Sequence, residues 1–279
     1  MFTPALLTFL LACGEKDPLD TADTGDTGTH GDGGGTSNGG GTGDGGGDGG
    51  GTGDGGGTGD GGGDGGAGSG SCPDFFPADR VGIRWDFRTT HEDGSTVDWT
   101  QEVLPEEAGQ FGLRTDLDGT RSDLFYTCDS EQAVELHGGR SSGGSYSVEF
   151  GYSPAMLMWP GGEPKEELGW YSAGSQSGTW TAGGSSGALS GSFSSQWTIT
   201  GVGLTYDLED GTTLTDCVTW TRQSETTTMG STVATDELGI YCGSLYGLVW
   251  NDVVTTTTTS GGPPLVAESW TRLTGLTVP

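Results

Sequence analysis

Val81-Gly82-Ile83-Arg84-Trp85-Asp86-Phe87-Arg88 alternates strictly between large apolar side chains and residues that are charged or lack a side chain. Successive side chains of an extended chain point to opposite faces, so alternation puts all the apolar groups on one face. Period two over several residues is typical of a strand with one buried side. The stretch therefore predicts a half-buried β-strand.

The same alternation continues on both sides of a turn. Glu92-Asp93-Gly94-Ser95 has turn composition, and Val97, Trp99 and Val103 resume the apolar face beyond it. The two strands predict a hairpin. Further strands are expected at 111–115, 124–128, 133–137, 146–152, 179–182, 192–208, 213–228, 238–241, 247–259 and 265–273.

Turn residues separate these strands, and no window shows an amphipathic helix with caps. Asp118-Gly119 and Glu209-Asp210-Gly211 are turns of this kind, while Gly201 interrupts the apolar phase of the long strand 192–208 and predicts a bulge. We expect one all-β domain at residues 72–279, an antiparallel curled sheet that forms a half-barrel, a barrel or a sandwich.

Residues 13–71 differ in composition from that domain. Gly, Asp, Thr and Ser dominate, with no apolar residue between Ala22 and Ala67. A segment with nothing to bury cannot offset the entropy of ordering, so we expect a disordered tether spanning about 40 Å. A calcium-binding β-roll is the alternative, but its repeats need an apolar residue in each turn.

The first twelve residues form a short apolar run before Cys13, too short to span a bilayer and typical of an export signal. Leu10-Leu11-Ala12-Cys13 resembles the lipobox of bacterial lipoproteins. The resemblance implies a signal peptide at residues 1–12, cleavage before Cys13, and acyl chains such as palmitate on that cysteine. It also implies attachment to the outer membrane through the lipid anchor, facing either the periplasm or the outside.

Charge restricts the partners. The chain carries a formal charge of −29, and the domain keeps 28 acidic and nine basic residues. Nucleic acid and anionic lipid surfaces are poor partners for such a protein. An envelope protein or a small apolar ligand remains as a partner, and the sequence does not give the oligomeric state.

Four cysteines remain besides Cys13, namely Cys72, Cys128, Cys217 and Cys242. An even number in an exported domain predicts two disulfides, for which three pairings exist. We favour Cys72 with Cys128 and Cys217 with Cys242, because the second pair lies on strands close in sequence. No two of these cysteines have the spacing of zinc ligands, so we expect neither a metal nor another cofactor.

Catalytic patterns are weak. Gly-x-Ser-x-Gly occurs at 139–143 and 183–187, but in Gly/Ser turns, and the last histidine, His137, precedes both serines. Carboxylate pairs such as Asp116 with Asp118, or Glu106 with Glu107, could serve a polysaccharide hydrolase, yet solvated turns of an acidic domain carry such pairs without function. No catalytic residue is therefore assigned.

Aromatic residues offer the remaining site candidates. Most of the nine tryptophans alternate with polar residues and are expected in the core, whereas Trp159 and Trp170 are candidates for ligand contact on a loop or rim. The run 255–259, all threonine, is typical of an exposed edge strand.

Short motifs of the domain resemble a loose group of uncharacterised β-rich lipoprotein and periplasmic domains. They are Gly82 to Phe87, Met158-Trp159-Pro160, 216–220, 239–243 and 246–250. The resemblance carries no activity. We expect a non-enzymatic envelope lipoprotein that binds a partner or a small apolar ligand, with a surface-display protein and a carboxylate-dependent polysaccharide hydrolase as alternatives.

Overall fold

A computed structural model describes residues 72–77, 79–243 and 245–279. The expected signal peptide, the acylation of Cys13 and the tether lie outside these residues and stay predictions. Among the residues that are described, no helix has the length and apolar character needed to cross a membrane.

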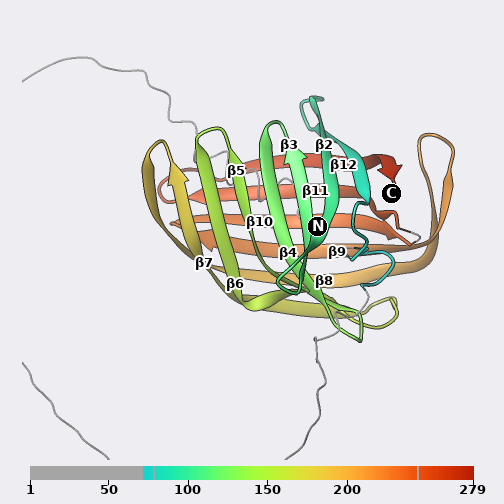
Figure 1. Cartoon of the computed structure of the whole chain (residues 1–279). Coiled ribbons are helices and arrows are strands. Elements are labelled where there is room, and N and C mark those ends of the chain that lie inside the picture. The colour runs from blue at the N-terminus through green and yellow to red at the C-terminus, as the bar shows by residue number, and fades with distance from the viewer. Residues whose placement is uncertain (1–71, 78, 244) are drawn as a thin grey trace, which may run out of the picture. The chain divides into compact units, whose positions relative to one another are not determined.

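The described chain is all-β, as expected, and its strands close into a barrel (Figure 1). The strands are β1 (Arg84–His91), β2 (Thr96–Glu107), β3 (Gln110–Leu117), β4 (Thr120–Cys128), β5 (Ala133–Gly143), β6 (Tyr146–Pro160), β7 (Gly169–Ala182), β8 (Ser185–Asp207), β9 (Thr213–Thr228), β10 (Ser231–Cys242), β11 (Gly247–Thr259) and β12 (Leu265–Thr277).

Each strand pairs antiparallel with its neighbour in sequence, and β1 pairs with β12 to close the barrel. The closing register runs from Arg84 opposite Thr277 to His91 opposite Ser269. Of the three architectures expected from the sequence, the structure selects the barrel. Figure 1 shows β2 to β6 crossing in front of β8 to β11.

Turn chemistry accounts for the hairpins. Gly94 has φ of 81° in the β1–β2 turn, and Asp118 and Gly119 have φ of 44° and 76° in the β3–β4 turn. Both backbone positions of that second turn are left-handed, a conformation that Asp tolerates and Gly adopts without strain. The predicted turns therefore match those observed.

The bulge predicted at Gly201 is also confirmed, because the pairing of β8 with β9 shifts register on both sides of this residue. Two other expectations are wrong. The strand expected at 146–152 is longer, since β6 runs through Pro154 to Pro160. The threonine run 255–259 is not at an edge, because Thr255 pairs with Thr235 on one side and with Ala267 on the other.

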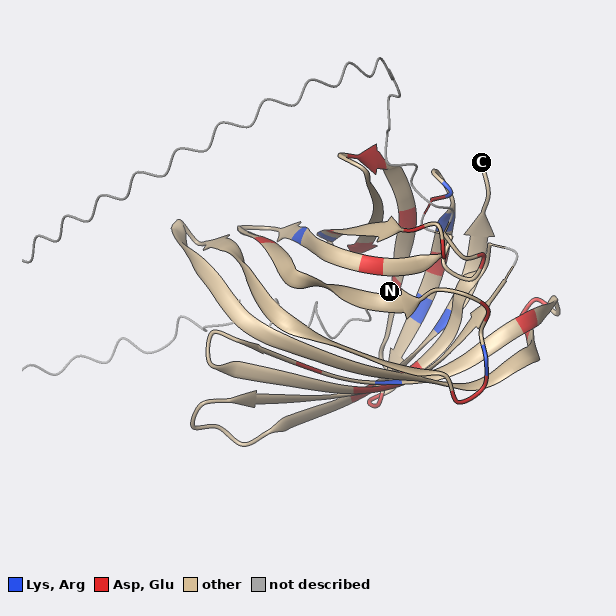
Figure 2. Ribbon diagram, turned by 90° about the horizontal axis from the view of Figure 1, so that it is seen from below, with Lys and Arg blue, Asp and Glu red and all other residues tan. Residues whose placement is uncertain are grey.

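Alternation along each strand separates a packed interior from an outer face. On β1, Trp85, Phe87 and Thr89 are buried, whereas the arginines and the aspartate between them lie on the outside. Burial of a large apolar side chain contributes roughly 1.5–3 kcal/mol. Aspartate and glutamate lie on turns as well as on strands (Figure 2).

The interior of the barrel is densely packed around Gly239. Gly239 on β10 faces Trp220 on β9, and a Cβ added at Gly239 would lie 2.3 Å from Trp220 Cζ2. The indole therefore occupies the space that any other side chain at position 239 would need.

Candidate functional site

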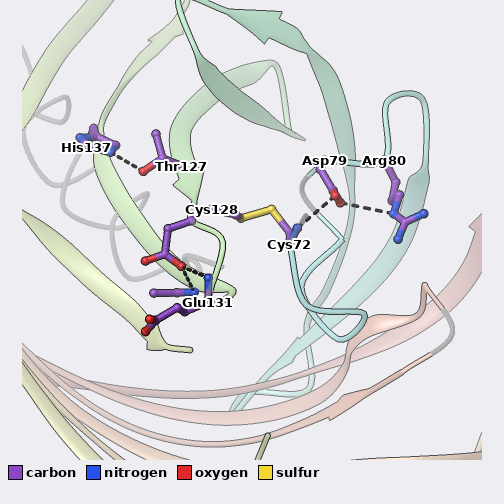
Figure 3. The surroundings of a disulfide bond; sticks show 9 residues. Cys72, Asp79, Arg80, Thr127, Cys128, Glu131 and His137 are labelled. Carbon is purple, nitrogen blue, oxygen red and sulfur yellow. Dashed lines mark hydrogen bonds and ion pairs between the residues drawn. A yellow bond between two sulfur atoms is a disulfide. The ribbon is translucent and has the colours of Figure 1, made fainter. Parts of the chain in front are cut away.

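The two disulfides fix one end of the barrel. Cys72 is bonded to Cys128 at the end of β4, and Cys217 on β9 is bonded to Cys242 on β10, which is the pairing favoured from the sequence. The first bond holds the segment before β1 against the barrel (Figure 3). Asp79 supports that segment, because its Oδ2 accepts a hydrogen bond from the Cys72 backbone N–H at 3.0 Å.

A row of aromatic rings fills the interior near this end. Consecutive centroids lie between 4.8 and 5.5 Å apart. The rings are those of Phe75, Trp159, Trp170, Trp197, Trp220 and Tyr241. They enclose a hollow of about 20 Å³. That volume holds roughly one water molecule, so a larger ligand would have to displace side chains.

Trp159 and Trp170 belong to this row. They lie near the end of β6 and the start of β7, with only 4% and 9% of their surface exposed. Trp170 Nε1 donates a hydrogen bond to the Leu157 carbonyl at 3.3 Å. The sequence placed them on a loop or rim, and the loop position is wrong, because both lie on strands near one end of the barrel with their rings buried. Both line the small hollow, and ligand contact by them stays a prediction.

The middle of the interior holds a charged network. Arg222 Nη2 lies 2.5 Å from Glu237 Oε2, and Asn251 Nδ2 donates to Glu237 Oε1 at 2.6 Å. The Arg222 guanidinium also lies 5.0 Å from the centroid of the Trp197 ring. Only 4% of the Arg222 side chain and 1% of the Glu237 side chain are exposed. Removing one partner of such a deeply buried ion pair lowers the unfolding free energy of a protein strongly.

Interior tyrosines share this environment. Burial raises the pKa of Tyr126, Tyr152 and Tyr241 well above the ordinary tyrosine value, and the positive charge of Arg222 opposes this rise only in part. Their phenols therefore stay neutral throughout the physiological pH range. None of these three phenols is therefore a general base near neutral pH.

A groove of about 420 Å³ opens where β12 ends, and we call it the end groove. Its walls are the β8–β9 turn, Tyr246 and the last residues of the chain. The apolar side chains that line it are Leu208, Tyr246, Leu273, Leu276 and Val278. Glu209 and Asp210 add carboxylates from the turn.

Two interactions hold the turn that forms one wall of the end groove. Glu209 is ion-paired with Arg272 on β12, which ties the turn to the last strand. The backbone N–H of Thr212 donates to Asp210 Oδ1 at 2.9 Å. This hydrogen bond lowers the pKa of the Asp210 carboxyl, so the rim of the groove stays negatively charged at neutral pH.

A second groove, of about 400 Å³, lies on the outer face of β3 to β7, and we call it the arginine groove. Its charged side chains are Arg114, Arg121, Asp123, Arg140 and Glu149. Neither groove was anticipated from the sequence. The sequence shows the charged residues of each strand. Which of them are neighbours in the sheet depends on the register of the strands.

The candidate catalytic groups have partners other than one another. Ser141 Oγ accepts a hydrogen bond from Ser122 at 2.8 Å, and the His137 ring is bonded to Thr127 Oγ1 at 2.8 Å. Asp116 is ion-paired with Arg121 at 2.9 Å rather than facing a second carboxylate. Within the described ranges, no three His, Cys, Asp or Glu side chains form a group that could hold a metal ion.

The fold defines the class of this protein as a closed, twelve-stranded antiparallel barrel. No protein-family model matches the chain, and no curated protein matches it. Among solved structures, the chain is similar to a protein of unknown function from the DUF3598 family of Nostoc punctiforme. The identity is 9%, the coverage is 72% of this chain and 98% of that chain, and the TM-score is 0.16. A score this low carries no argument about function or family.

Proposed function

We propose that this protein is a non-enzymatic binding protein of the cell envelope, lipid-anchored through Cys13, and that its ligand is a small apolar molecule held in the end groove. The observation that carries the proposal is the groove itself, with about 420 Å³ of volume and five apolar side chains in its wall. Ligand pockets typically measure about 300–1,000 Å³. In this groove the apolar side chains share the wall with Glu209, Asp210, Thr212 and Thr274, so a ligand with polar groups as well as apolar ones would fit the lining.

Charge selects among apolar ligands. Glu209 and Asp210 lie beside the apolar wall. Arg272 compensates the charge of Glu209, so Asp210 and the large negative charge of the domain as a whole set the sign. An anionic head group would be repelled at this position. The proposed ligand is therefore neutral, or it carries a positive group that lies near the two carboxylates.

Fluorescent probes of different charge test the proposal on the full chain. N-phenyl-1-naphthylamine is neutral and brightens in apolar surroundings, and anilinonaphthalene sulfonate is its anionic counterpart. We expect saturable binding of the neutral probe and much weaker binding of the anionic one. Absence of saturable binding of the neutral probe would contradict the proposal.

A pair of exposed valines provides a matched control. Val278 lines the end groove with 53% of its surface exposed, whereas Val202 is 38% exposed and lies outside the groove. Val278→Asp should weaken binding of the neutral probe about tenfold, which corresponds to about 1.4 kcal/mol. Val202→Asp should leave the affinity unchanged. Equal losses in both variants would show that the probe binds elsewhere.

The second candidate is a structural or surface-display protein without a small ligand. The observation that favours it is the filled aromatic end of the interior, where the hollow measures only about 20 Å³. A rigid barrel stapled by two disulfides suits a displayed module. Failure of every probe to bind, with the barrel folded, would favour this candidate over the binding protein.

The hydrolase alternative depends on a carboxyl that can donate a proton. Burial alone would raise the pKa of Asp123, but hydrogen bonds from Arg114 and Arg140 outweigh it and hold the pKa below the ordinary value. Asp123 therefore stays ionised at neutral pH and is unsuited to act as a general acid. Accumulation of reducing ends when the protein is incubated with envelope polysaccharides would support the hydrolase alternative.

A further inference from the structure

The arginine groove lies on the side of the barrel formed by β3 to β7 and shares no residue with the end groove. It brings together three of the nine basic residues of a strongly acidic domain. Hydroxyl groups of the neighbouring strands complete its polar lining, from Ser142, Ser147, Thr179 and Thr181.

Register aligns the charges of this groove in a row. Arg114 on β3 lies opposite Asp123 on β4, Asp123 lies opposite Arg140 on β5, and Arg140 lies opposite Glu149 on β6. Thr179 on β7 continues the row beyond Glu149. Hydrogen-bond donors and acceptors thus alternate across five neighbouring strands, spaced by roughly 4.8 Å.

The centre of the row is rigid. Arg114 donates to both Asp123 oxygens, with Nε to Oδ1 at 2.7 Å and Nη2 to Oδ2 at 2.9 Å. Arg140 approaches Oδ2 from the other side, with Nε at 3.1 Å and Nη2 at 3.0 Å. The Asp123 side chain is only 4% exposed, and the Arg140 guanidinium also lies 5.3 Å from the centroid of the Phe125 ring. Side chains already held in place lose little further freedom when they bind a ligand.

Bonding capacity remains on the solvent side. A guanidinium has five N–H donors, and Arg140 directs two of its nitrogens to Asp123 while half of its side chain stays exposed. Arg121 is similarly exposed and is held by Asp116 at 2.9 Å. Exposed Glu149 offers acceptors beside these donors. The groove therefore presents fixed donors and acceptors side by side.

The charge balance separates two ligand classes. Each of two arginines has a carboxylate partner, and Glu149 faces the third, so the groove is close to neutral overall. A phosphate or sulfate would find no net positive charge and would lie near the Glu149 carboxylate. A polyhydroxylated molecule suits the alternation, because each sugar hydroxyl both donates and accepts.

We propose that the arginine groove is a binding site for a neutral saccharide, on the outer wall of the barrel and independent of the apolar ligand proposed for the end groove. Adjacent sugar hydroxyls bridge the guanidinium donors of Arg140 and Arg121 and the acceptors of Glu149, while serine and threonine hydroxyls provide further bonds.

The test is binding of the full chain to a panel of immobilised neutral oligosaccharides, namely glucan, mannan, galactan and chitin fragments, followed by titration calorimetry with any that is retained. Retention of at least one neutral saccharide is expected. Failure to retain any would overturn the proposal. Displacement of the retained saccharide by millimolar inorganic phosphate or sulfate would overturn it in favour of an oxyanion site.

Variants locate the binding. Arg140→Lys keeps the charge but loses the fixed planar donors, so the affinity for the saccharide should fall at least tenfold. Arg88→Lys is the matched control, because Arg88 forms the same kind of two-point pair with Asp98, at 2.7 and 3.0 Å, outside the groove. Equal losses in both variants would overturn the proposed location.

Two further variants keep the test informative. Thr179→Val removes an exposed hydroxyl of the groove, so it should weaken saccharide binding even if Arg140→Lys fails to fold. Unchanged affinity in Thr179→Val and Arg140→Lys together would contradict the assignment. Val278→Asp should leave saccharide binding intact, which separates failure of this site from failure of the end groove.

Discussion

The buried charge network predicts a large and specific loss of stability. Replacing Glu237 by Leu leaves the Arg222 charge inside the barrel, where only 4% of that side chain reaches solvent. It also removes the acceptor of the Asn251 hydrogen bond. Removing one partner of such a pair costs about 3–5 kcal/mol of unfolding free energy. For a domain of about 200 residues, this corresponds to a fall in Tm of roughly 6–20 °C.

Removing the whole network should be far less harmful than removing one member. The triple variant Arg222→Met, Glu237→Leu, Asn251→Leu removes both charges together with the amide, so its unfolding free energy should lie well above that of Glu237→Leu. Calorimetry and urea unfolding with both disulfides intact measure the difference. Asp98→Ala, which breaks the exposed pair with Arg88, is the surface control. If Glu237→Leu were no more harmful than this control, the reasoning would be refuted.

Three further outcomes follow from the packing of the interior. Gly239→Ala should destabilise the barrel by about 1–3 kcal/mol and alter the near-ultraviolet circular dichroism, because the added methyl overlaps the Trp220 ring; an unchanged spectrum and stability would contradict the packing described. Cys72→Ser should lower the unfolding free energy by up to about 4 kcal/mol, because the disulfide joins residues 56 positions apart. It should also increase the quenching of tryptophan fluorescence by acrylamide, because the disulfide holds the segment that places Phe75 against Trp159. The pKa values of Tyr126, Tyr152 and Tyr241 are raised in the folded state, whereas tyrosines of the unfolded chain ionise near pH 10. The unfolding free energy should therefore be fully present below pH 10 and fall as the pH rises above it. Ultraviolet titration should show that these three phenols ionise only when the barrel unfolds.

The strands with strict alternation were predictable because one face of each packs against a dense core. The stretch predicted from Val81 is an example, with Ile83, Trp85 and Phe87 almost fully buried. Its start is wrong, because β1 begins at Arg84 and Val81 lies before it with 48% of its surface exposed. By contrast, β7 and the first half of β8 are rich in Gly and Ser. Their backbone hydrogen bonds to both neighbouring strands hold them in the barrel with few apolar side chains, so periodicity gave a weak signal.

Closure of the barrel was beyond sequence reasoning because it depends on pairing between β1 and β12, near opposite ends of the domain. The misplaced edge at 255–259 has the same cause, since a run of threonines suits an edge strand until the pairing with β12 is known. The burial of Trp159 and Trp170 likewise depends on contacts between strands. The register of the strands also determines which residues form the arginine groove, because three separate strands each contribute one arginine to it.

Native mass spectrometry of the full-length protein, extracted from its own membrane in mild detergent, tests the central claim most directly. The account predicts a chain that begins at acylated Cys13, with two internal disulfides and a noncovalently bound, neutral or cationic apolar molecule. Val278→Asp protein prepared in the same way should lack that molecule and keep the acyl chains. An unacylated Cys13, or a bound molecule retained equally by Val278→Asp and Val202→Asp, would contradict the account.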